Sequence, residues 1–478
     1  MTAGVRGILG SACRVVAVLP TALALACETR PGAQASADVA PVVTLSLGQT
    51  FQTISGWEAA AQLGEVDCNR EAYRRYRAEV VDRAVNELGL TRLRLDLRSG
   101  VESGRDTWPA YLAGDLSYPR WRATWFVPRN DNANPRVADP AGFQWGRFDH
   151  NVTEVVVPVR EALAARGERL YLNLNYVDFW LGAATKPFSH FADPEEYAEL
   201  VHVVFDHMQQ KFGFVPDGLE ILLEPENTPH DARQMGRAIV AVVARLAEAG
   251  YHPDIIAPST TRMANAPAWY DEMLSVPGVA GQIDELAYHR YTGLSRPTLA
   301  AIAQRATRDG LSTAMLEHLG SGFAELYEDL TVGNVSAWQQ FTIAYCGRRD
   351  NPDASGAYLQ VNQADSMAPR VHLTRSARLF RQVFGYVRPG AVRLAAASSD
   401  ASLRPLAFRN ANGSAVVVGW TDGAITFTVR DLPAGRYGIN YSTTHGRYNE
   451  ELPEVEISGG GVVQVPMPAA GVVTVYGK

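Results

Sequence analysis

Short apolar runs alternate with longer amphipathic stretches between about residues 51 and 341. The apolar runs have strand length and predict β-strands at 51–60, 90–97, 170–176, 219–224, 255–258, 283–291, 313–317 and 335–341. The stretches between them carry apolar residues every three or four positions and predict helices at 70–88, 150–165, 193–211, 230–249 and 296–308. Eight strands separated by helices are typical of an α/β fold of the (β/α)8 TIM-barrel type.

After residue 386 the pattern changes to closely spaced strand-like runs separated by turns such as Asn412-Gly413 and Asp422-Gly423. This pattern predicts a C-terminal all-β side sandwich at 386–478. Residues 42–51 also alternate, and we expect them to join that sandwich. The predicted domains are therefore a linker and N-terminal strand at 36–52, a barrel at 53–385 and the sandwich.

The first 35 residues are predicted to be a signal peptide and the start of a tether. A basic start precedes a 12-residue apolar run at 15–26, which is too short to span a bilayer. Small-residue cleavage sites end at Ala26 and at Ala35. Cleavage at the first site would leave Cys27 at the N-terminus, where a lipid anchor could be attached. We therefore predict an exported protein, extracellular or periplasmic, with a lipoprotein as one form of export.

Charge and composition exclude several classes of function. The formal net charge of -7 disfavours a nucleic-acid partner, which needs clustered positive charge. The three lysines lie outside any P-loop pattern, and no CxxC or HExxH motif is present, so we expect neither a cofactor nor a metal. Cys68 follows the first predicted strand and Cys346 the eighth, which are neighbours in a closed barrel. A disulfide between them and two free thiols are both open at this point.

Strand periodicity predicts which side chains point into the barrel. Helices cover the outer face, so the apolar set of each strand faces outward and the polar set inward. The inward set at or near the carboxyl ends of the strands is Arg94, Asn175, Glu224, His289, Tyr291 and Glu317. In TIM barrels this end carries the active site.

Two of these residues are carboxylates on different strands, Glu224 on the fourth and Glu317 on the seventh. Glycoside hydrolysis needs such a pair, one carboxyl to protonate the leaving oxygen and one to attack the anomeric carbon. The alternative is that both glutamates are buried ion-pair partners of Arg92 or Arg94.

Six segments in the expected order resemble glycoside hydrolases of clan A, and most closely family 30, the group of glucosylceramidases, xylanases and β-1,6-glucanases. They are QTISGW (52–57), LLEPEN (222–227), HRY (289–291), AMLEH (314–318), VSAW (335–338) and YVRPGAVRL (386–394). The resemblance covers about residues 42–478 and implies an exported O-glycosyl hydrolase that acts on a β-linked oligo- or polysaccharide. We expect a monomer.

The resemblance implies a retaining, double-displacement mechanism, with Glu224 as acid/base and Glu317 as nucleophile. In that mechanism the two carboxyl groups lie about 5–5.5 Å apart. Arg94 and Tyr291 are expected to hold Glu317 ionised. His289 is expected to bind sugar hydroxyls or Glu317.

Some positions depart from the family pattern. The family usually has Asn directly before the acid/base glutamate, where it binds the sugar 2-hydroxyl, and this chain has Leu223. Glu226 is the alternative acid, and Glu58 is interpreted as a solvated loop charge. Leu223 also supports the alternative of a non-catalytic glycan-binding protein on the same fold.

Seven of the nine tryptophans fall in segments that would form the catalytic face. Several lie in a long insertion at 98–148, where about half of the aromatic residues are expected to form a small core of their own. Trp57, Trp180 and Trp338 are predicted to bind substrate, because a flat aromatic ring can stack on the apolar face of a sugar.

Overall fold

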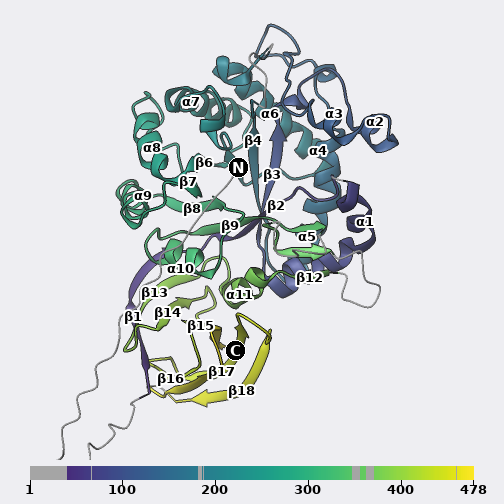
Figure 1. Cartoon of the computed structure of the whole chain (residues 1–478). Coiled ribbons are helices and arrows are strands. Elements are labelled where there is room, and N and C mark those ends of the chain that lie inside the picture. The colour runs from purple at the N-terminus through teal and green to yellow at the C-terminus, as the bar shows by residue number, and fades with distance from the viewer. Residues whose placement is uncertain are drawn as a thin grey trace, which may run out of the picture. The chain divides into compact units, whose positions relative to one another are not determined.

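The computed structural model describes residues 40–65, 67–180, 186, 188–346, 356–361, 371–458 and 460–478, and the side chains of 67–72 and 346 are not among the parts described (Figure 1). The predicted signal peptide, Cys27 and the side chains of Cys68 and Cys346 lie outside this description. Export, lipid attachment and the disulfide therefore stay predictions.

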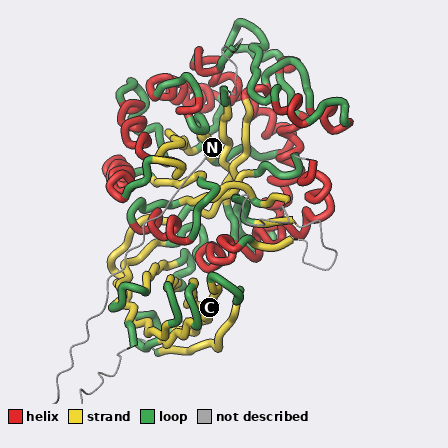
Figure 2. The backbone as a smooth tube through the Cα atoms, in the orientation of Figure 1, coloured by secondary structure: helices red, strands yellow, loops and turns green. Residues whose placement is uncertain are grey.

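Eight parallel strands close into a barrel, which confirms the predicted TIM-barrel fold (Figure 2). In order around the barrel they are β2 (Gly56–Ala60), β3 (Arg92–Arg98), β4 (Tyr171–Val177), β5 (Gly218–Glu220), β6 (Asp254–Arg262), β7 (Glu285–Thr292), β8 (Ser312–Glu317) and β9 (Ala337–Thr342). Pairing of β9 with β2 closes the ring.

Amphipathic helices surround the strands and bury their apolar faces against them. The helices are α1 (Asp67–Asp82), α4 (Gly146–Asn151), α5 (Val157–Ala164), α6 (Pro194–Phe212), α7 (Ala232–Glu248), α8 (Ala266–Leu274), α9 (Arg296–Asp309), α10 (Phe323–Thr331) and α11 (Arg375–Phe384). Short π-helical segments, Arg83–Leu88 and Val152–Val156, continue α1 and join α4 to α5. The sequence pattern did not predict α8, α10 or α11. Helix α11 packs against Trp57 and Trp338.

The 98–148 insertion after β3 carries two short helices, α2 (Trp108–Ala113) and α3 (Tyr118–Arg122). Trp108, Tyr111 and Trp121 form a cluster of their own there, with Trp125 packed against it. The expected small core of the insertion is thus present, and it takes up more of the tryptophans than expected.

The C-terminal strands form one nine-stranded sheet. Its order is β18 (Glu450–Ile457), β17 (Gly435–Thr443), β20 (Gly471–Gly477), β15 (Ala415–Thr421), β14 (Leu403–Arg409), β13 (Val392–Ser398), β1 (Val42–Thr53), β16 (Ile425–Arg430) and β19 (Val463–Met467). Side chains from both halves of the sheet share one buried cluster, so the sheet folds over its own core. A separate three-stranded sheet contains β10 (Ala344–Cys346), β11 (Leu359–Val361) and β12 (Val371–Leu373).

The predicted first strand, 51–60, is two strands that belong to different sheets. β1 pairs with β13 and β16 in the C-terminal sheet, and β2 belongs to the barrel. The chain changes sheet at Gly56, whose φ is +146°. A Cβ there would lie 2.6 Å from the hydroxyl of Thr91, so both the conformation and the space require glycine.

Strand alternation holds along β3 and β7, but not at the two predicted catalytic glutamates. On β8, Met315 joins the outer core, whereas Ala314 and Leu316 join a separate inner cluster with Ala287. Simple alternation from Met315 would therefore turn Glu317 to the outer face as well. A register shift between β7 and β8, just before Glu317, turns that side chain inward.

Among the described residues, no helix combines the length and the apolar composition needed to cross a bilayer.

Candidate active site

Glu317 lies at the end of β8 and is held from two sides. Arg94 Nη2 donates to its Oε2 at 2.5 Å, and the Tyr291 hydroxyl donates to its Oε1 at 2.7 Å. Arg94 comes from β3, and Tyr291 comes from β7, the neighbour of β8. Side chains from two other strands of the barrel therefore hold this carboxylate. Both contacts match the predicted pairing of this residue.

Glu224 lies four residues beyond the end of β5 and is placed by its backbone. Its φ of +48° is left-handed, a conformation that costs a non-glycine residue about 1–3 kcal/mol. Its N–H donates to Ser259 O at 3.1 Å, and its side chain accepts from Asn227 Nδ2 at 2.8 Å. The strained turn holds the carboxylate at the barrel mouth instead of continuing the strand.

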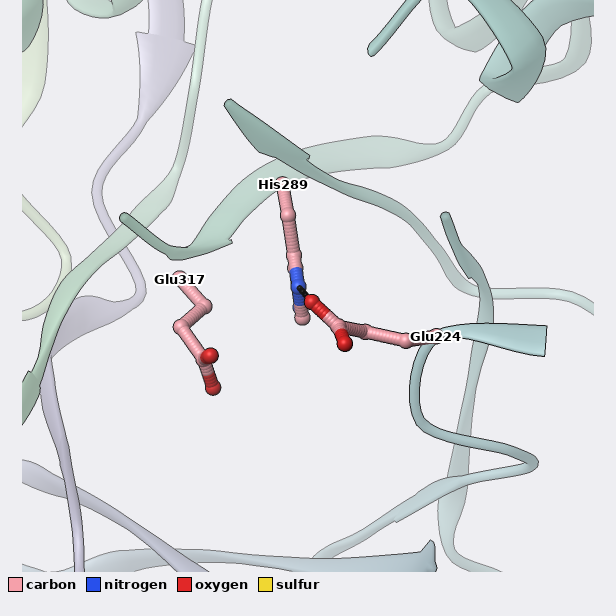
Figure 3. Close-up of side chains that lie close together, drawn as sticks. All are labelled: Glu224, His289 and Glu317. Carbon is pink, nitrogen blue, oxygen red and sulfur yellow. Dashed lines mark hydrogen bonds and ion pairs between the residues drawn. The ribbon is translucent and has the colours of Figure 1, made fainter. Parts of the chain in front are cut away.

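Glu224, His289 and Glu317 lie close together, and His289 is hydrogen-bonded to Glu224 (Figure 3). Its Nδ1 is 3.0 Å from Glu224 Oε1. Ligand atoms of Glu224, His289 and Glu317 all lie within 4.8 Å of one another. The structure therefore pairs His289 with Glu224, where sugar hydroxyls or Glu317 were expected as partners.

The charges around this group shift the pKa values of Glu317 and His289. Burial alone would raise its pKa, but Arg94, His289 and the hydroxyl of Tyr291 outweigh burial and place the pKa below its ordinary value of 4.5. For His289, burial would lower the pKa, but the hydrogen bond to Glu224 and the charge of Glu317 raise it. Glu317 is thus kept ionised, as predicted.

The structure also places the other carboxylates that were considered. Glu226 accepts from Thr261 N, Arg262 N and Asn265 Nδ2, so its carboxylate is bound to the end of β6 and to the turn that follows. Glu58 is fully buried on β2 and accepts from Arg92 Nε at 2.7 Å. Its interpretation as a solvated loop charge is wrong, because Glu58 points into the barrel.

Trp57 and Trp338 are fully buried on the outer side of the barrel, which is against their predicted role in substrate binding. The ring of Trp57 stacks on Phe384 at 4.4 Å, and its indole N–H donates to Val387 O. Trp338 packs edge-on against Phe380 and donates to Asp329. Helix α11, which the sequence pattern did not predict, covers both. Alternation from the inward Glu58 could have shown that Trp57 faces outward.

Asn175 and Trp180 remain open as substrate-binding residues. Asn175 is fully buried on β4, and neither atom of its amide has a partner among the described residues. Trp180 is half-buried after β4, with the Lys186 ammonium 5.2 Å from its ring centroid and His230 edge-on to it.

Leu223, at the position where the family usually has Asn, is buried in a small apolar cluster with Phe126 and Val177. Phe126 comes from the 98–148 insertion. The apolar side chain at this position is thus matched by an apolar partner that the insertion supplies.

Glu224, His289 and Glu317 are also the kinds of ligand that bind a metal ion. Their surroundings fit a metal poorly, because the Arg94 guanidinium already neutralises Glu317 and both of its oxygens accept hydrogen bonds.

A closed parallel barrel with a separate all-β sheet is also the domain layout of solved family 30 glycoside hydrolases. The comparison with solved structures agrees. A family 30 endoxylanase from Clostridium papyrosolvens C71 is 16% identical, with a TM-score of 0.62, over 91% of this chain and 99% of that one. The family 30 xylanase C catalytic domain from Talaromyces cellulolyticus is 15% identical, with a TM-score of 0.63, over 91% and 100%.

An endo-β1,6-glucanase is 14% identical, with a TM-score of 0.64, over 93% of this chain and 94% of that one. No protein-family model and no curated protein matches the sequence. At these identities the likeness shows the fold.

Proposed function

We propose that this protein is an exported retaining glycoside hydrolase that cleaves a β-linked glycan. Glu317 is the nucleophile and Glu224 the acid/base. The observation that carries the proposal is the approach of the two carboxylates to within 4.8 Å at the carboxyl end of the barrel. This separation is close to the roughly 5–5.5 Å between carboxyl groups of retaining enzymes and shorter than the roughly 6.5–9.5 Å of inverting ones, so it supports direct attack on the sugar.

In the first step an oxygen of Glu317 attacks the anomeric carbon while Glu224 donates its proton to the glycosidic oxygen. The bond between that carbon and oxygen breaks, the leaving alcohol departs, and Glu317 carries the sugar as an ester. In the second step Glu224, now a carboxylate, takes a proton from water. The resulting hydroxide equivalent displaces Glu317, and the product keeps the β configuration.

The surroundings of each glutamate suit its role. Arg94 and Tyr291 keep Glu317 ionised before attack and stabilise it again when it leaves. One proton lies between His289 Nδ1 and Glu224 Oε1, so the state of His289 is tied to the charge that Glu224 carries in each step. His289 is therefore placed to orient the acid/base.

The substrate class follows from the fold and from the N-terminus. The compared enzymes include xylanases and an endo-β1,6-glucanase, so we propose a β-linked polysaccharide or oligosaccharide as substrate. The predicted signal peptide supports a reaction outside the cytoplasm, and we propose that the enzyme acts as a monomer.

Three isosteric substitutions test the proposal. Glu317→Gln should lower kcat by a factor on the order of 10⁴ or more, since it removes the attacking charge. Glu224→Gln should lower it by a factor on the order of 10²–10⁴. Glu226→Gln, two residues away at a partly exposed carboxylate that accepts hydrogen bonds from the end of β6, is the matched control and should keep most activity. The measurement is release of reducing sugar from xylan and from β-1,6-glucan.

Azide separates the two roles. With an activated aryl β-glycoside, Glu224→Ala should regain turnover in azide and form the β-glycosyl azide, because azide needs no general base. The first sugar released by wild type should be the β-anomer, measured by proton NMR. A wild-type protein that binds these glycans but releases no sugar would instead be the non-catalytic glycan-binding protein.

A further inference from the structure

The 98–148 insertion holds a cavity beside the upper end of β3. The cavity is partly open to solvent, and its free volume is about 60 Å³. The lining includes Asp96 and Arg98 from β3, Trp108 and Trp125 from the insertion, and Arg147 from α4. The function proposed above does not use this cavity.

Apart from Arg147 Nη2, which is ion-paired with Glu65, three polar atoms of the lining have no hydrogen-bond partner within the described part of the chain. They are Asp96 Oδ1, Arg98 Nη1 and Trp125 Nε1. Asp96 and Arg98 are 3% and 6% exposed, so these groups are buried as well as unpaired. Leaving such a group unpaired costs about 1–3 kcal/mol. One acceptor and two donors together match the hydroxyls of a sugar, each of which can donate and accept.

The charges around the cavity balance. Glu65 is 2.6 Å from Arg98 Nη2 and 2.7 Å from Arg147 Nη2. Burial would raise the pKa of Glu65, but the two guanidinium groups outweigh burial and lower it to about 2. Both arginines therefore have an ionised partner, and Asp96 adds a further negative charge. The cavity has no surplus of positive charge that would select an acidic ligand.

The cavity lies next to the proposed active site along one strand. Asp96 follows Arg94 by two residues and points to the same side of β3, about 7 Å farther toward the barrel mouth. Arg94 contacts Glu317 directly. A chain of sugars bound across the glutamates could thus extend into the cavity.

We propose that this cavity is a subsite for an uncharged sugar residue of the glycan chain that is held at Glu224 and Glu317. Asp96 accepts from one sugar hydroxyl, and Arg98 and Trp125 donate to others. The Arg98 guanidinium lies 3.4 Å from the centroid of the Trp125 ring, so both donors are held in place before the sugar binds. The subsite rests on the proposed function only in that the ligand is the same glycan.

The test measures binding with hydrolysis switched off. Full-length Glu317→Gln protein is titrated by calorimetry with β-1,4-xylohexaose and with a β-1,6-linked glucohexaose. Adding Trp125→Phe removes the indole N–H but keeps a ring over Arg98, and should weaken binding of the preferred hexasaccharide about tenfold. Adding Trp145→Phe, which lies in the same insertion but outside the lining, should leave binding unchanged.

Asp96→Asn gives a second test if Trp125→Phe does not fold, and should weaken the same hexasaccharide by several-fold. Equal binding by the Trp125, Asp96 and Trp145 variants would overturn the subsite, as would failure of both hexasaccharides to bind. Sugar release by wild type is scored separately. If wild type releases sugar but Trp125→Phe does not change hexasaccharide binding, the proposed hydrolase function stands and the subsite is rejected. If Trp125→Phe weakens hexasaccharide binding but wild type releases no sugar, the subsite stands and the hydrolase function is rejected.

Discussion

Two arginines of β3, Arg92 and Arg94, show how differently one barrel uses the same side chain. Arg92 donates to Glu58 at 2.7 Å and to both oxygens of Glu285 at 2.9 and 3.0 Å. Arg94, two residues farther along, has Glu317 as its ion-pair partner, a backbone carbonyl as its second acceptor and an Nε without a partner among the described residues.

The difference separates the part of the barrel interior that is fully packed from the part that can bind a ligand. Around Arg92 one guanidinium is hydrogen-bonded to two buried carboxylates at once, so this part of the barrel interior contributes to folding. Around Arg94 one cation serves a carboxylate that is still slightly exposed at 7%. Incomplete pairing next to a strained glutamate marks the layer where a substrate can complete the network.

The largest expected effect that would test this comparison is on stability. Arg92→Met leaves two buried carboxylates without their cation and should lower the free energy of unfolding by about 3–5 kcal/mol. Arg94→Met leaves one, nearer to solvent, and should cost less. Denaturant unfolding of both variants measures the difference. If Arg94→Met proves the more destabilising, the upper layer is structural and the comparison fails.

The next effect is on pH dependence. A carboxylate that acts as a nucleophile must be ionised. Because the pKa of Glu317 is lowered from its ordinary value of 4.5, this side chain stays ionised at pH values somewhat below 4.5. Arg94→Met removes the main cause, so the pKa rises and the acid limb of kcat/KM moves to higher pH by about 1 to 3 units. Hydrolysis of an aryl β-glycoside across pH measures it. An unmoved acid limb would show that Arg94 does not set the charge of Glu317.

The lowered pKa of Glu317 also makes the free energy of unfolding depend on pH, in a direction that can be stated in advance. Because the folded pKa of Glu317 is lowered, its contribution is present above the unfolded value and is lost as pH falls through the folded value. Wild type should therefore lose more stability than Arg94→Met on acidification through this range. Thermal melting of the two proteins at matched pH values checks the sign.

The smallest effect concerns Tyr291. Tyr291→Phe removes one hydrogen bond to Glu317 but leaves the charge of Arg94 in place. We expect kcat/KM near neutral pH to fall about tenfold, with a smaller move of the acid limb in the same direction. Tyr288→Phe is the matched control, because the Tyr288 hydroxyl donates a hydrogen bond to Asp329 on the outer side of the barrel. A larger pH shift for Tyr291→Phe than for Arg94→Met would reverse the proposed order of the two contacts.

The alternation of β3 and β7 could be predicted because each strand stays regular between outer helices. Arg92, Arg94, His289 and Tyr291 lie on the face that periodicity gives them. The two glutamates reach that face by other routes, Glu317 through a register shift and Glu224 through a left-handed residue beyond the strand. Their placement was predicted, although the strand pattern alone does not explain it.

The tryptophans mark the limit of reading a linear pattern. Position near strand ends suggested that Trp57 and Trp338 bind sugar, but α11 covers both from a segment more than 30 residues beyond the last barrel strand. Trp125 received no individual role, and it lines the cavity of the insertion. An aromatic residue can fill a core or a binding site equally well, and only its neighbours in space decide which.

The sequence by itself determined the eight-strand rhythm and the inward face of each regular strand, because these follow from local periodicity and strand order. Only the tertiary structure decided which carboxylate each arginine meets, that Glu58 is buried, and which tryptophans are covered. Those outcomes depend on register and on packing between segments far apart in the chain, and no local pattern records either.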